Sequence, residues 1–280
     1  MATLARIPGV TWLLIAALAV AGCSGDDAES VEDQPPDVLY QSARQNLDAG
    51  DFVEAAESFG EVERLYPYSD WAKRAVVMSA FAFHQAGLYD NSREAALRYL
   101  DFYPADEDAA YARYLVALSY YDQIDDVSRD QSITVNAMQA LRTVVEFYPE
   151  SEYATAARLK LDLTRDHLAA KEMAVGRYYM KQGQFGAAIN RFRVVVEDYE
   201  TTSHTPEALH RLVESYLSLG LEGDALTAAA ILGHNFRGSD WYRDSYALLN
   251  DRSIDSGETG ILAGGWLGDV YRRVIRGDWL

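Results

Sequence analysis

Histidines and aspartates are the residues of this chain whose types could bind a metal or transfer protons. The five histidines lack the His-Glu-x-x-His spacing of zinc hydrolases, and the nearest pair, His204 and His210, need not share a helix face. Four aspartates fall in one stretch, but without the spacing and central glycine of a calcium-binding loop: Asp122, Asp125, Asp126 and Asp130. A solvated acidic loop is the favoured interpretation, and we predict no metal site.

Motifs for catalysis are also missing from the sequence. No Gly-x-Ser-x-Gly element is present that could form a nucleophile elbow. Residues 260–268 are rich in glycine, but they lack the Lys-Ser/Thr pair and the preceding strand of a phosphate-binding loop. Carboxylate pairs are so frequent among 43 acidic residues that none is diagnostic. We therefore predict a non-enzymatic protein that works by binding and needs no cofactor.

The only cysteine, Cys23, follows a short apolar stretch and a run of small residues. Arg6 is the only charged side chain before it, and the apolar stretch 10–21 is too short to cross a bilayer. Val20-Ala21-Gly22-Cys23 resembles the lipobox of bacterial lipoproteins, in which the cysteine is lipidated and becomes the new N-terminus. The resemblance implies that residues 1–22 are a signal peptide and that Cys23 carries N-palmitoyl and S-diacylglycerol chains. The alternatives are an ordinary cleaved signal with an incidental cysteine, or a disulfide partner.

The residues after the cysteine indicate where such a lipoprotein would reside. Ser24 stands where an aspartate would suggest retention in the inner membrane, so we expect an anchor in the outer membrane that faces the periplasm. Residues 23–37, rich in Asp, Glu and Pro, are expected to form the acylated end and a flexible tether.

The net charge narrows the classes of partner. Removal of residues 1–22 takes away Arg6 and no acid, so the formal net charge changes from −18 to −19. Nucleic acid is excluded as a partner because neutralising its phosphates requires a basic face. A polybasic contact with anionic lipid is excluded for the same reason, which leaves membrane attachment to the acyl chains.

An internal repeat organises the rest of the chain. Three copies of one phrase are clear, Leu65–Ser69, Phe102–Asp106 and Phe147–Ser151, and two degenerate copies follow at 198–202 and 235–239. Their aromatic positions 66, 103, 148, 199 and 236 are spaced by 37, 45, 51 and 37 residues. Periods in this range are typical of stacked supersecondary units.

Each phrase is predicted to end one helix and begin the next. Proline disfavours helical geometry in the residue before it, and Ser69, Asp106 and Ser151 are expected to act as N-caps. Glycines near the middle of the repeats favour helix C-termini, at Gly50, Gly87, Gly183 and Gly220. Between these signals the apolar residues keep helical spacing, as in Phe52, Ala55, Phe59, Val62 and Tyr66. We predict an all-α fold, a helical solenoid of about five tetratricopeptide-like repeats.

Two irregularities divide the solenoid into halves. An acidic loop at 121–130 stretches the third unit, and a long helical run from Glu152 to Gln182 opens the fourth. We therefore expect two binding regions, residues 38–150 with repeats 1–3 and residues 151–250 with repeats 4–5. Residues 251–280 are expected to form a linker and an amphipathic tail helix, which either caps the last repeat or binds a partner.

The inner face of such a solenoid comes mainly from the first helix of each pair. This rule selects Tyr40 and Arg44 in the first unit, and Arg74, Phe81 and His84 in the second. Aromatic and guanidinium groups suit an extended segment with aromatic side chains and a C-terminal carboxylate. The alternative for Phe81 is packing within the repeat core.

The lipobox, the acidic tether and the repeats with their Tyr-Pro-x-Ser phrase resemble the BamD family, lipoproteins of the β-barrel assembly machinery of Gram-negative outer membranes. Residues 147–154 and 188–192 carry the resemblance, together with Leu163-Thr164-Arg165-Asp166-His167-Leu168-Ala169, a run that repeat packing alone does not demand. The resemblance covers roughly residues 23–249.

The family resemblance implies a division of labour between the halves. The N-terminal repeats would receive unfolded outer-membrane proteins through a C-terminal signal, and the C-terminal repeats would dock the POTRA region of the barrel subunit BamA. Arg191, preceded by Asn190, corresponds to a family arginine that pairs with an acidic residue of that subunit, and other lipoproteins of the complex are further expected partners.

Two other classes of protein remain open at this point. One is a periplasmic repeat adaptor of the Tol-associated cell-division coordinator type, against which Cys23 and the absence of heptads before Leu39 argue. The other is a cell-wall hydrolase or its activator, which survives only because missing motifs are weak evidence.

Overall fold

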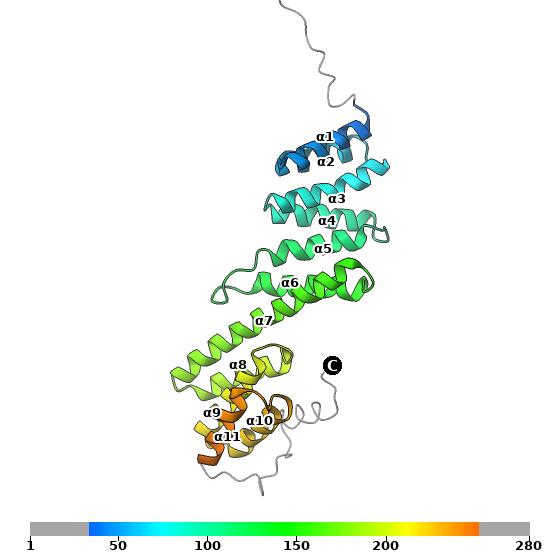
Figure 1. Ribbon diagram of the computed structural model, residues 1–280. Coiled ribbons are helices and arrows are strands. Elements are labelled where there is room, and N and C mark those ends of the chain that lie inside the picture. Colours follow the sequence, from blue (N-terminus) through cyan, green and yellow to red (C-terminus); the bar gives the residue numbers. More distant parts are fainter. Residues whose placement is uncertain (1–33, 252–280) are drawn as a thin grey trace, which may run out of the picture.

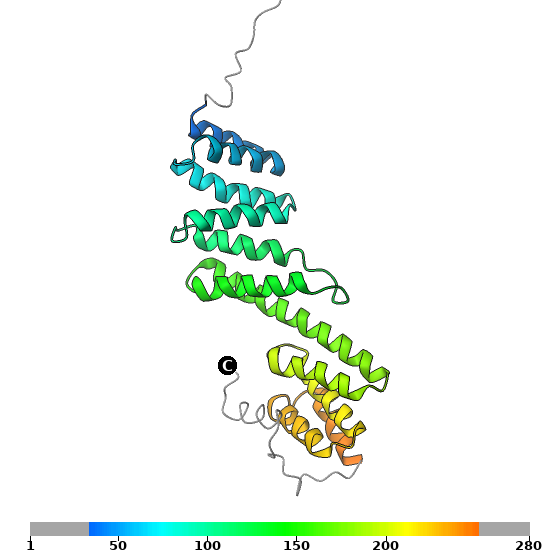
Figure 2. The same ribbon diagram turned by 180° about the vertical axis from the view of Figure 1, so that it is seen from behind.

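The computed structural model describes residues 34–251, and this part of the chain is built from helices (Figures 1 and 2). The helices are α1 Pro36–Ala49, α2 Phe52–Leu65, α3 Asp70–Gln85, α4 Tyr89–Phe102, α5 Ala109–Tyr121, α6 Ser132–Phe147, α7 Glu152–Lys181, α8 Phe185–Asp198, α9 Thr205–Ser218, α10 Glu222–Asn235 and α11 Asp240–Asp251. Each helix packs against the next, which gives five hairpins from α1 to α10 and a final helix against α9 and α10. The predicted all-α solenoid of about five repeats is confirmed.

Several expectations concern residues that lie outside the described part. The signal peptide 1–22, Cys23, most of the tether and the tail 252–280 all belong to this group. Within residues 34–251, no helix has the length and apolarity needed to cross a membrane.

The turns inside the hairpins form where glycine was expected. Gly50, Gly87, Gly183 and Gly220 all have positive φ, between 70° and 88°. Only glycine adopts this left-handed geometry without steric cost, and it lets the chain reverse within a few residues. At Gly50, for example, the N–H groups that follow α1 bond to the carbonyls of Asn46 and Leu47.

The turns between hairpins follow the sequence prediction at two of three predicted caps. The hydroxyls of Ser69 and Ser151 accept hydrogen bonds from the N–H groups of Ala72 and Ala154, as N-caps of α3 and α7. Asp106 is not an N-cap, because α5 begins three residues later, after Asp108. Its carboxylate accepts a local hydrogen bond from the Asp108 N–H before the helix begins, and it also binds the Tyr99 hydroxyl of α4 and Lys73 Nζ of α3.

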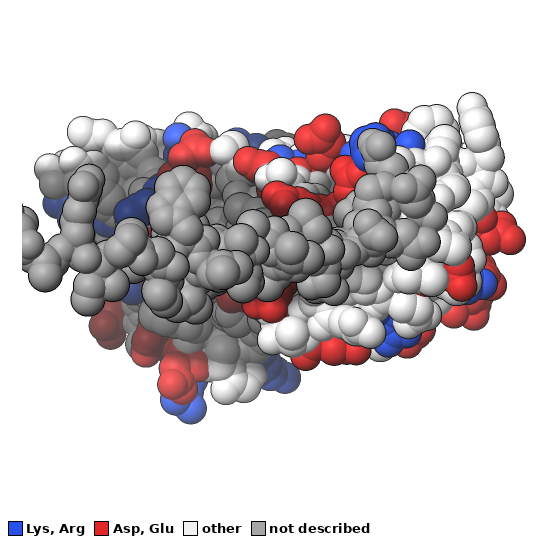
Figure 3. All heavy atoms as spheres, turned by 90° about the horizontal axis from the view of Figure 1, so that it is seen from above, with Lys and Arg blue, Asp and Glu red and all other residues white. Residues whose placement is uncertain are grey.

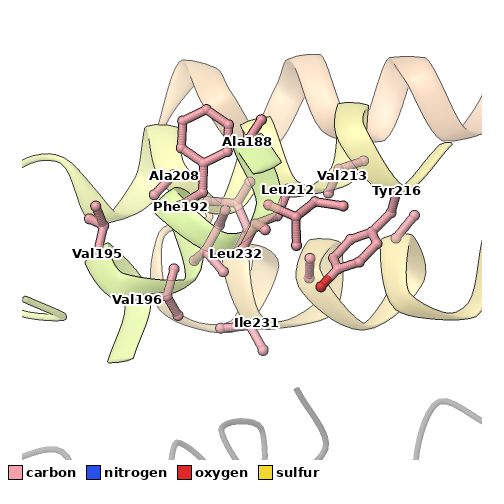
Figure 4. Close-up of a cluster of buried hydrophobic side chains, with 14 of the residues drawn as sticks. Ala188, Phe192, Val195, Val196, Ala208, Leu212, Val213, Tyr216, Ile231 and Leu232 are labelled. Atoms are coloured by element: carbon pink, nitrogen blue, oxygen red, sulfur yellow. The ribbon is translucent and has the colours of Figure 1, made fainter. Parts of the chain in front are cut away.

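Apolar stripes from neighbouring hairpins interlock into a chain of small cores. Phe59 of α2 and Phe192 of α8 occupy equivalent positions, and both side chains are fully buried. The largest core joins α7 to α11 and is centred on α8, α9 and α10 (Figure 4). Gly176 of α7 packs directly on the Phe192 ring, so a small residue allows α7 and α8 to approach closely.

The long helix α7 connects the two halves of the solenoid. Its first half packs on α5 and α6 and its second half on α8, and Figure 1 shows it running diagonally from one side of the solenoid to the other. The acidic loop before α6 contacts α7, where Lys171 Nζ donates hydrogen bonds to the carbonyls of Ser128 and Arg129. The expected long helix at mid-solenoid is therefore present, as one uninterrupted element of 30 residues.

Candidate binding surfaces

The first helices of successive hairpins share one face of the N-terminal half. Helix α1 contacts α3, α3 contacts α5, and α5 contacts α7. Side chains that project from these helices can therefore form a surface that runs across several repeats. All five groove residues predicted from the sequence lie on α1 and α3.

Two of these residues contact Trp71, and Arg44 lies four residues after one of them, Tyr40, on α1. The Tyr40 ring packs against Phe59 and Trp71, with centroid distances of 5.2 and 5.1 Å, and is only 9% exposed. The guanidinium group of Arg74 lies over the Trp71 ring, with Cζ 5.6 Å from the ring centroid. Burial raises the pKa of the Tyr40 hydroxyl, while the positive charges of Arg44 and Arg74 oppose that shift. Tyr40 is thus mainly part of the repeat core, and the two arginines are the groups available to a ligand.

The other two predicted residues lie toward the far end of α3. Phe81 is half-buried and packs against the core of the second and third hairpins, as its alternative interpretation supposed. His84 Nε2 lies 3.0 Å from Asp122 Oδ2 at the end of α5, and its ring contacts Tyr89 edge to face. Phe81 and His84 thus contact groups other than those around Tyr40 and Trp71.

A tyrosine cluster on α5 and α7 was missed by the sequence reasoning. The ring of Tyr153 lies 5.1 Å from that of Tyr111 and 5.6 Å from that of Tyr114. Burial, more than the neighbouring groups, raises the pKa of Tyr111 to about 12. Tyr111 and Tyr114 are three residues apart and so share one face of α5, which is the signal that could have found half of the cluster.

Asp108 adds an acidic group to this surface. Its negative charge contributes to the raised pKa of the Tyr40, Tyr111 and Tyr153 hydroxyls. Burial, with the nearby charges of Asp106 and Glu107, raises the pKa of its carboxyl. The face thus offers cationic groups at α1 and α3, and phenol rings at α5 and α7. Among residues 34–251 no group of three or more potential metal ligands occurs.

In the C-terminal half, Asn190 and Arg191 are exposed on α8. Arg191 Nη1 lies 3.2 Å from Glu172 Oε2 on α7, and the arginine side chain is 44% exposed. A second network fixes α7 to α9, where Glu207 accepts from Arg177 and Arg211. Arg191 is thus a half-exposed cation that is held by a partner of its own chain.

Comparison with known proteins decides the family. Residues 32–231 match the model of the YfiO family, described as outer membrane lipoprotein. The outer membrane protein assembly factor BamD of Caulobacter vibrioides is 48% identical over 244 residues, which cover 86% of this chain and 80% of that protein. BamD of Rickettsia prowazekii is 38% identical over 239 residues, which cover 85% of this chain and 95% of its own. The chain belongs to the BamD family.

A more distant relative is consistent with this result. BamD of Neisseria meningitidis is 28% identical over 234 residues, covering 80% of this chain and 88% of that protein. Among solved structures, a thermophilic TPR protein of Thermus thermophilus matches 77% of this chain and 100% of its own, with 18% identity and a TM-score of 0.36. That score is too low to support the fold assignment, which depends on the helices themselves.

Membership of the BamD family establishes the setting in which this molecule works. The protein is an outer membrane lipoprotein with a lipid anchor, and a non-enzymatic component of the β-barrel assembly machinery. The family assignment also removes the cell-division coordinator and the cell-wall hydrolase from consideration. The BamD relatives thus identify the machinery to which this protein belongs.

Proposed function

We propose that residues 38–150 receive unfolded outer-membrane proteins on the face formed by α1, α3, α5 and α7. The observation that carries this proposal is the pair Arg44 and Arg74, two exposed cations on the first helices α1 and α3 of a strongly acidic protein. Arg74 lies over the Trp71 ring. A C-terminal carboxylate would pair with the guanidinium groups, since arginine binds carboxylates in a fixed fork geometry. Aromatic side chains of the same segment would pack on the cluster of Tyr111, Tyr114 and Tyr153.

We also propose that residues 151–250 dock a BamA-like barrel subunit through its POTRA region, with Arg191 and Asn190 in the contact. Arg191 is exposed enough to pair with an acidic group of a partner, and its present partner Glu172 is on the same chain. In the same proposal Cys23 carries the N-palmitoyl and S-diacylglycerol chains, and other lipoproteins of the complex contact the remaining surface.

Peptide binding tests the proposal for the N-terminal half. The probe is a synthetic peptide with alternating aromatic residues and a free C-terminal carboxylate, and its affinity is measured by fluorescence anisotropy with the full mature chain. Arg44→Ala together with Arg74→Ala is expected to weaken binding at least about tenfold, and amidation of the peptide C-terminus is expected to weaken binding by the wild type in the same way.

A matched control is available on a second helix. Arg142→Ala removes an exposed arginine of α6, which does not belong to the proposed face, and should leave the affinity unchanged. A loss of binding free energy from Arg142→Ala that is half the loss from the double variant would show that only net charge matters, since it removes one charge and the double variant removes two. Unchanged affinity in the double variant would reject the proposed site.

A further inference from the structure

The three most exposed large apolar side chains among residues 34–251 lie at one edge of the N-terminal half. They are Tyr68 at 101% exposure, Phe147 at 73% and Phe102 at 70%. Tyr68 lies in the turn between α2 and α3, and the two phenylalanines are the last residues of α4 and α6. The three turns that follow α2, α4 and α6 lie along the same side of the solenoid in both views (Figures 1 and 2). We call Tyr68, Phe102 and Phe147 the aromatic edge.

The repeat itself does not require these aromatic side chains. The last residue of the second helix is Leu65, Phe102 or Phe147 in the first three hairpins, and Asp198 or Asn235 in the last two. The change from apolar to polar occurs across α7, the helix that redirects the solenoid. Leu65 packs partly against the first core, but Phe102 and Phe147 stay exposed at the same position. Exposed aromatic rings there, and polar residues in the other half, indicate that the N-terminal half meets an apolar or interfacial surface.

The surroundings of the aromatic edge restrict the chemistry of that surface. A hollow of about 320 Å³ separates Tyr68 from Phe102, and side chains such as Pro67, Val76 and Tyr99 line it. Exposed acids stand directly beside the two phenylalanines, namely Asp101 and Glu146. Viewed from the N-terminal end, much of the right-hand side is uncharged, with acidic and some basic groups at its border (Figure 3). An edge that is apolar at its tip and acidic around it suits an uncharged surface better than an anionic one.

The chain enters the fold at this same edge. The Tyr66 hydroxyl, two residues before Tyr68, donates a 2.7 Å hydrogen bond to the carbonyl of Gln34, the first described residue. Ten residues separate Gln34 from Cys23. Fully extended, this segment spans at most about 40 Å, so an anchor at Cys23 keeps the edge near the bilayer.

We propose that the aromatic edge lies against the uncharged phospholipid headgroups of the membrane in which the protein is anchored, and that it orients the N-terminal half relative to that membrane. Tyrosine favours the membrane–water interface, because its apolar ring and its hydroxyl are both satisfied there, and phenylalanine rings bury apolar area at the boundary between headgroups and acyl chains. The acyl chains supply the attachment, so the edge has only to select one orientation of a molecule that is already at the surface. This inference builds on the proposed lipidation of Cys23.

Nitroxide accessibility in vesicles tests the proposal. The full chain, isolated with its lipid, is reconstituted into phosphatidylethanolamine–phosphatidylcholine vesicles, and mass spectrometry of the N-terminal peptide checks the acylation of Cys23 independently. Because acylation consumes the one native cysteine, a label on Ala105→Cys or Thr201→Cys is unique. Both positions are exposed and lie two residues after the tyrosine of their turn, in the N-terminal and C-terminal halves respectively.

We expect the label at 105 to collide several-fold less often with a water-soluble nickel chelate than the label at 201. Replacing Tyr68, Phe102 and Phe147 by serine should abolish that difference, and the exposure of all three residues predicts an unchanged melting temperature. Adding phosphatidylglycerol should reduce the difference, because the acids beside the edge repel an anionic surface.

Equal accessibility of the two labels in vesicles overturns the proposal. So does equal protection of position 105 in detergent without a bilayer, which would indicate contact with a second copy of the chain. Protection that appears only after a purified barrel subunit is added would assign the edge to a protein partner and would also reject the lipid surface. Failure of acylation at Cys23 is detected separately and bears on the proposed anchor alone.

Discussion

Asp166 Oδ1 accepts two hydrogen bonds from Ser203, at 3.1 Å from the backbone N–H and 2.7 Å from the hydroxyl. Asp166 lies on α7 and Ser203 in the turn between α8 and α9, so one carboxylate fastens the long helix to the fifth hairpin. Its neighbour Arg165 donates to the backbone carbonyl of Asp198, at 3.4 Å, from the same side. These contacts give a physical reason for the Arg-Asp pair in the run from Leu163 to Ala169, which repeat packing did not explain.

Replacement of Asp166 by alanine is expected to lower the free energy of unfolding by about 1 kcal/mol, because the side chain is partly exposed and water replaces part of each lost bond. Urea denaturation followed by circular dichroism measures the change. Asp162→Ala, an exposed acid one turn earlier on α7, is the control and should change stability by less than about 0.5 kcal/mol. An equal loss of unfolding free energy in both variants would indicate a general charge effect on α7 instead of the hydrogen bonds between Asp166 and Ser203.

Replacing Gly176 by alanine is predicted to change stability in the direction opposite to that usual for glycine to alanine in a helix. Alanine in the middle of a helix normally stabilises it by up to about 1 kcal/mol relative to glycine. A Cβ at position 176, however, would lie 2.4 Å from a carbon of the Phe192 ring, which is fully buried. Gly176→Ala is therefore expected to destabilise the protein by about 1–3 kcal/mol, since α7 and α8 must separate or Phe192 must leave its rotamer. Thermal unfolding of the full chain measures this.

The control for Gly176 is a glycine in the same kind of backbone with empty space around it. Gly60 lies inside α2, and nothing stands within 4 Å of its added Cβ. Gly60→Ala should raise the melting temperature, and the opposite signs of the two variants would isolate the Phe192 contact. If both variants stabilise the protein, a Cβ fits at position 176, and α7 and α8 do not approach each other there as closely as we describe.

The sequence was sufficient for features that depend on local physics. Gly50 and Gly87 close their helices because of their own backbone freedom, and Ser69 caps α3 through a bond to a residue three positions away. Asp106 has the same local pattern as Ser69 and was therefore also predicted as a cap. Its carboxylate is bound by Lys73 and Tyr99 from two other helices, and such tertiary contacts cannot be read from spacing along one chain segment.

The candidate binding face shows the same limit. The rule for inner faces selected Arg44 and Arg74, which are exposed side chains on first helices, but it also selected Tyr40, whose ring is buried in the core. Whether an aromatic side chain faces the core or the groove depends on the rotation of its helix against the next hairpin. Tyr153 was missed for a related reason, because it joins Tyr111 only through the packing of α7 on α5.

Asp106 also predicts how stability depends on pH. Hydrogen bonds from Lys73 and Tyr99 hold the pKa of this carboxyl below its ordinary value of 3.8. A carboxyl whose pKa is lower in the folded than in the unfolded state stabilises the fold above the unfolded value, and that contribution is lost as pH falls through the folded value. The difference in unfolding free energy between wild type and Asp106→Asn should thus be largest above about pH 5 and should shrink below about pH 4. Urea titrations at several pH values measure it, and a difference that stays constant down to about pH 3 would contradict the ion pair.

The ion pair between Arg191 and Glu172 allows a test of the proposed docking site. The side chain pairs with Glu172 in the free chain, at 3.2 Å, so a partner carboxylate must compete with Glu172. Arg191→Glu should weaken binding to a purified POTRA-containing barrel subunit about tenfold or more, because attraction becomes repulsion across the contact. Glu172→Gln removes the competitor without introducing a charge of opposite sign, and it should leave the affinity equal or higher. Biolayer interferometry with the mature chain gives both values.

Arg193 provides the matched control on the same helix. Its guanidinium pairs with Glu197 one turn further along α8, at 3.2 Å, so Arg193→Glu makes the same change in net charge two residues away. On an α-helix, positions 191 and 193 point about 160° apart, and a contact centred on Arg191 should therefore distinguish them. Equal weakening by Arg191→Glu and Arg193→Glu would reduce the effect to the overall charge of the C-terminal half. A loss of affinity in Glu172→Gln as large as that in Arg191→Glu would instead show that the pair acts as a unit, with the ion pair itself orienting the docking surface.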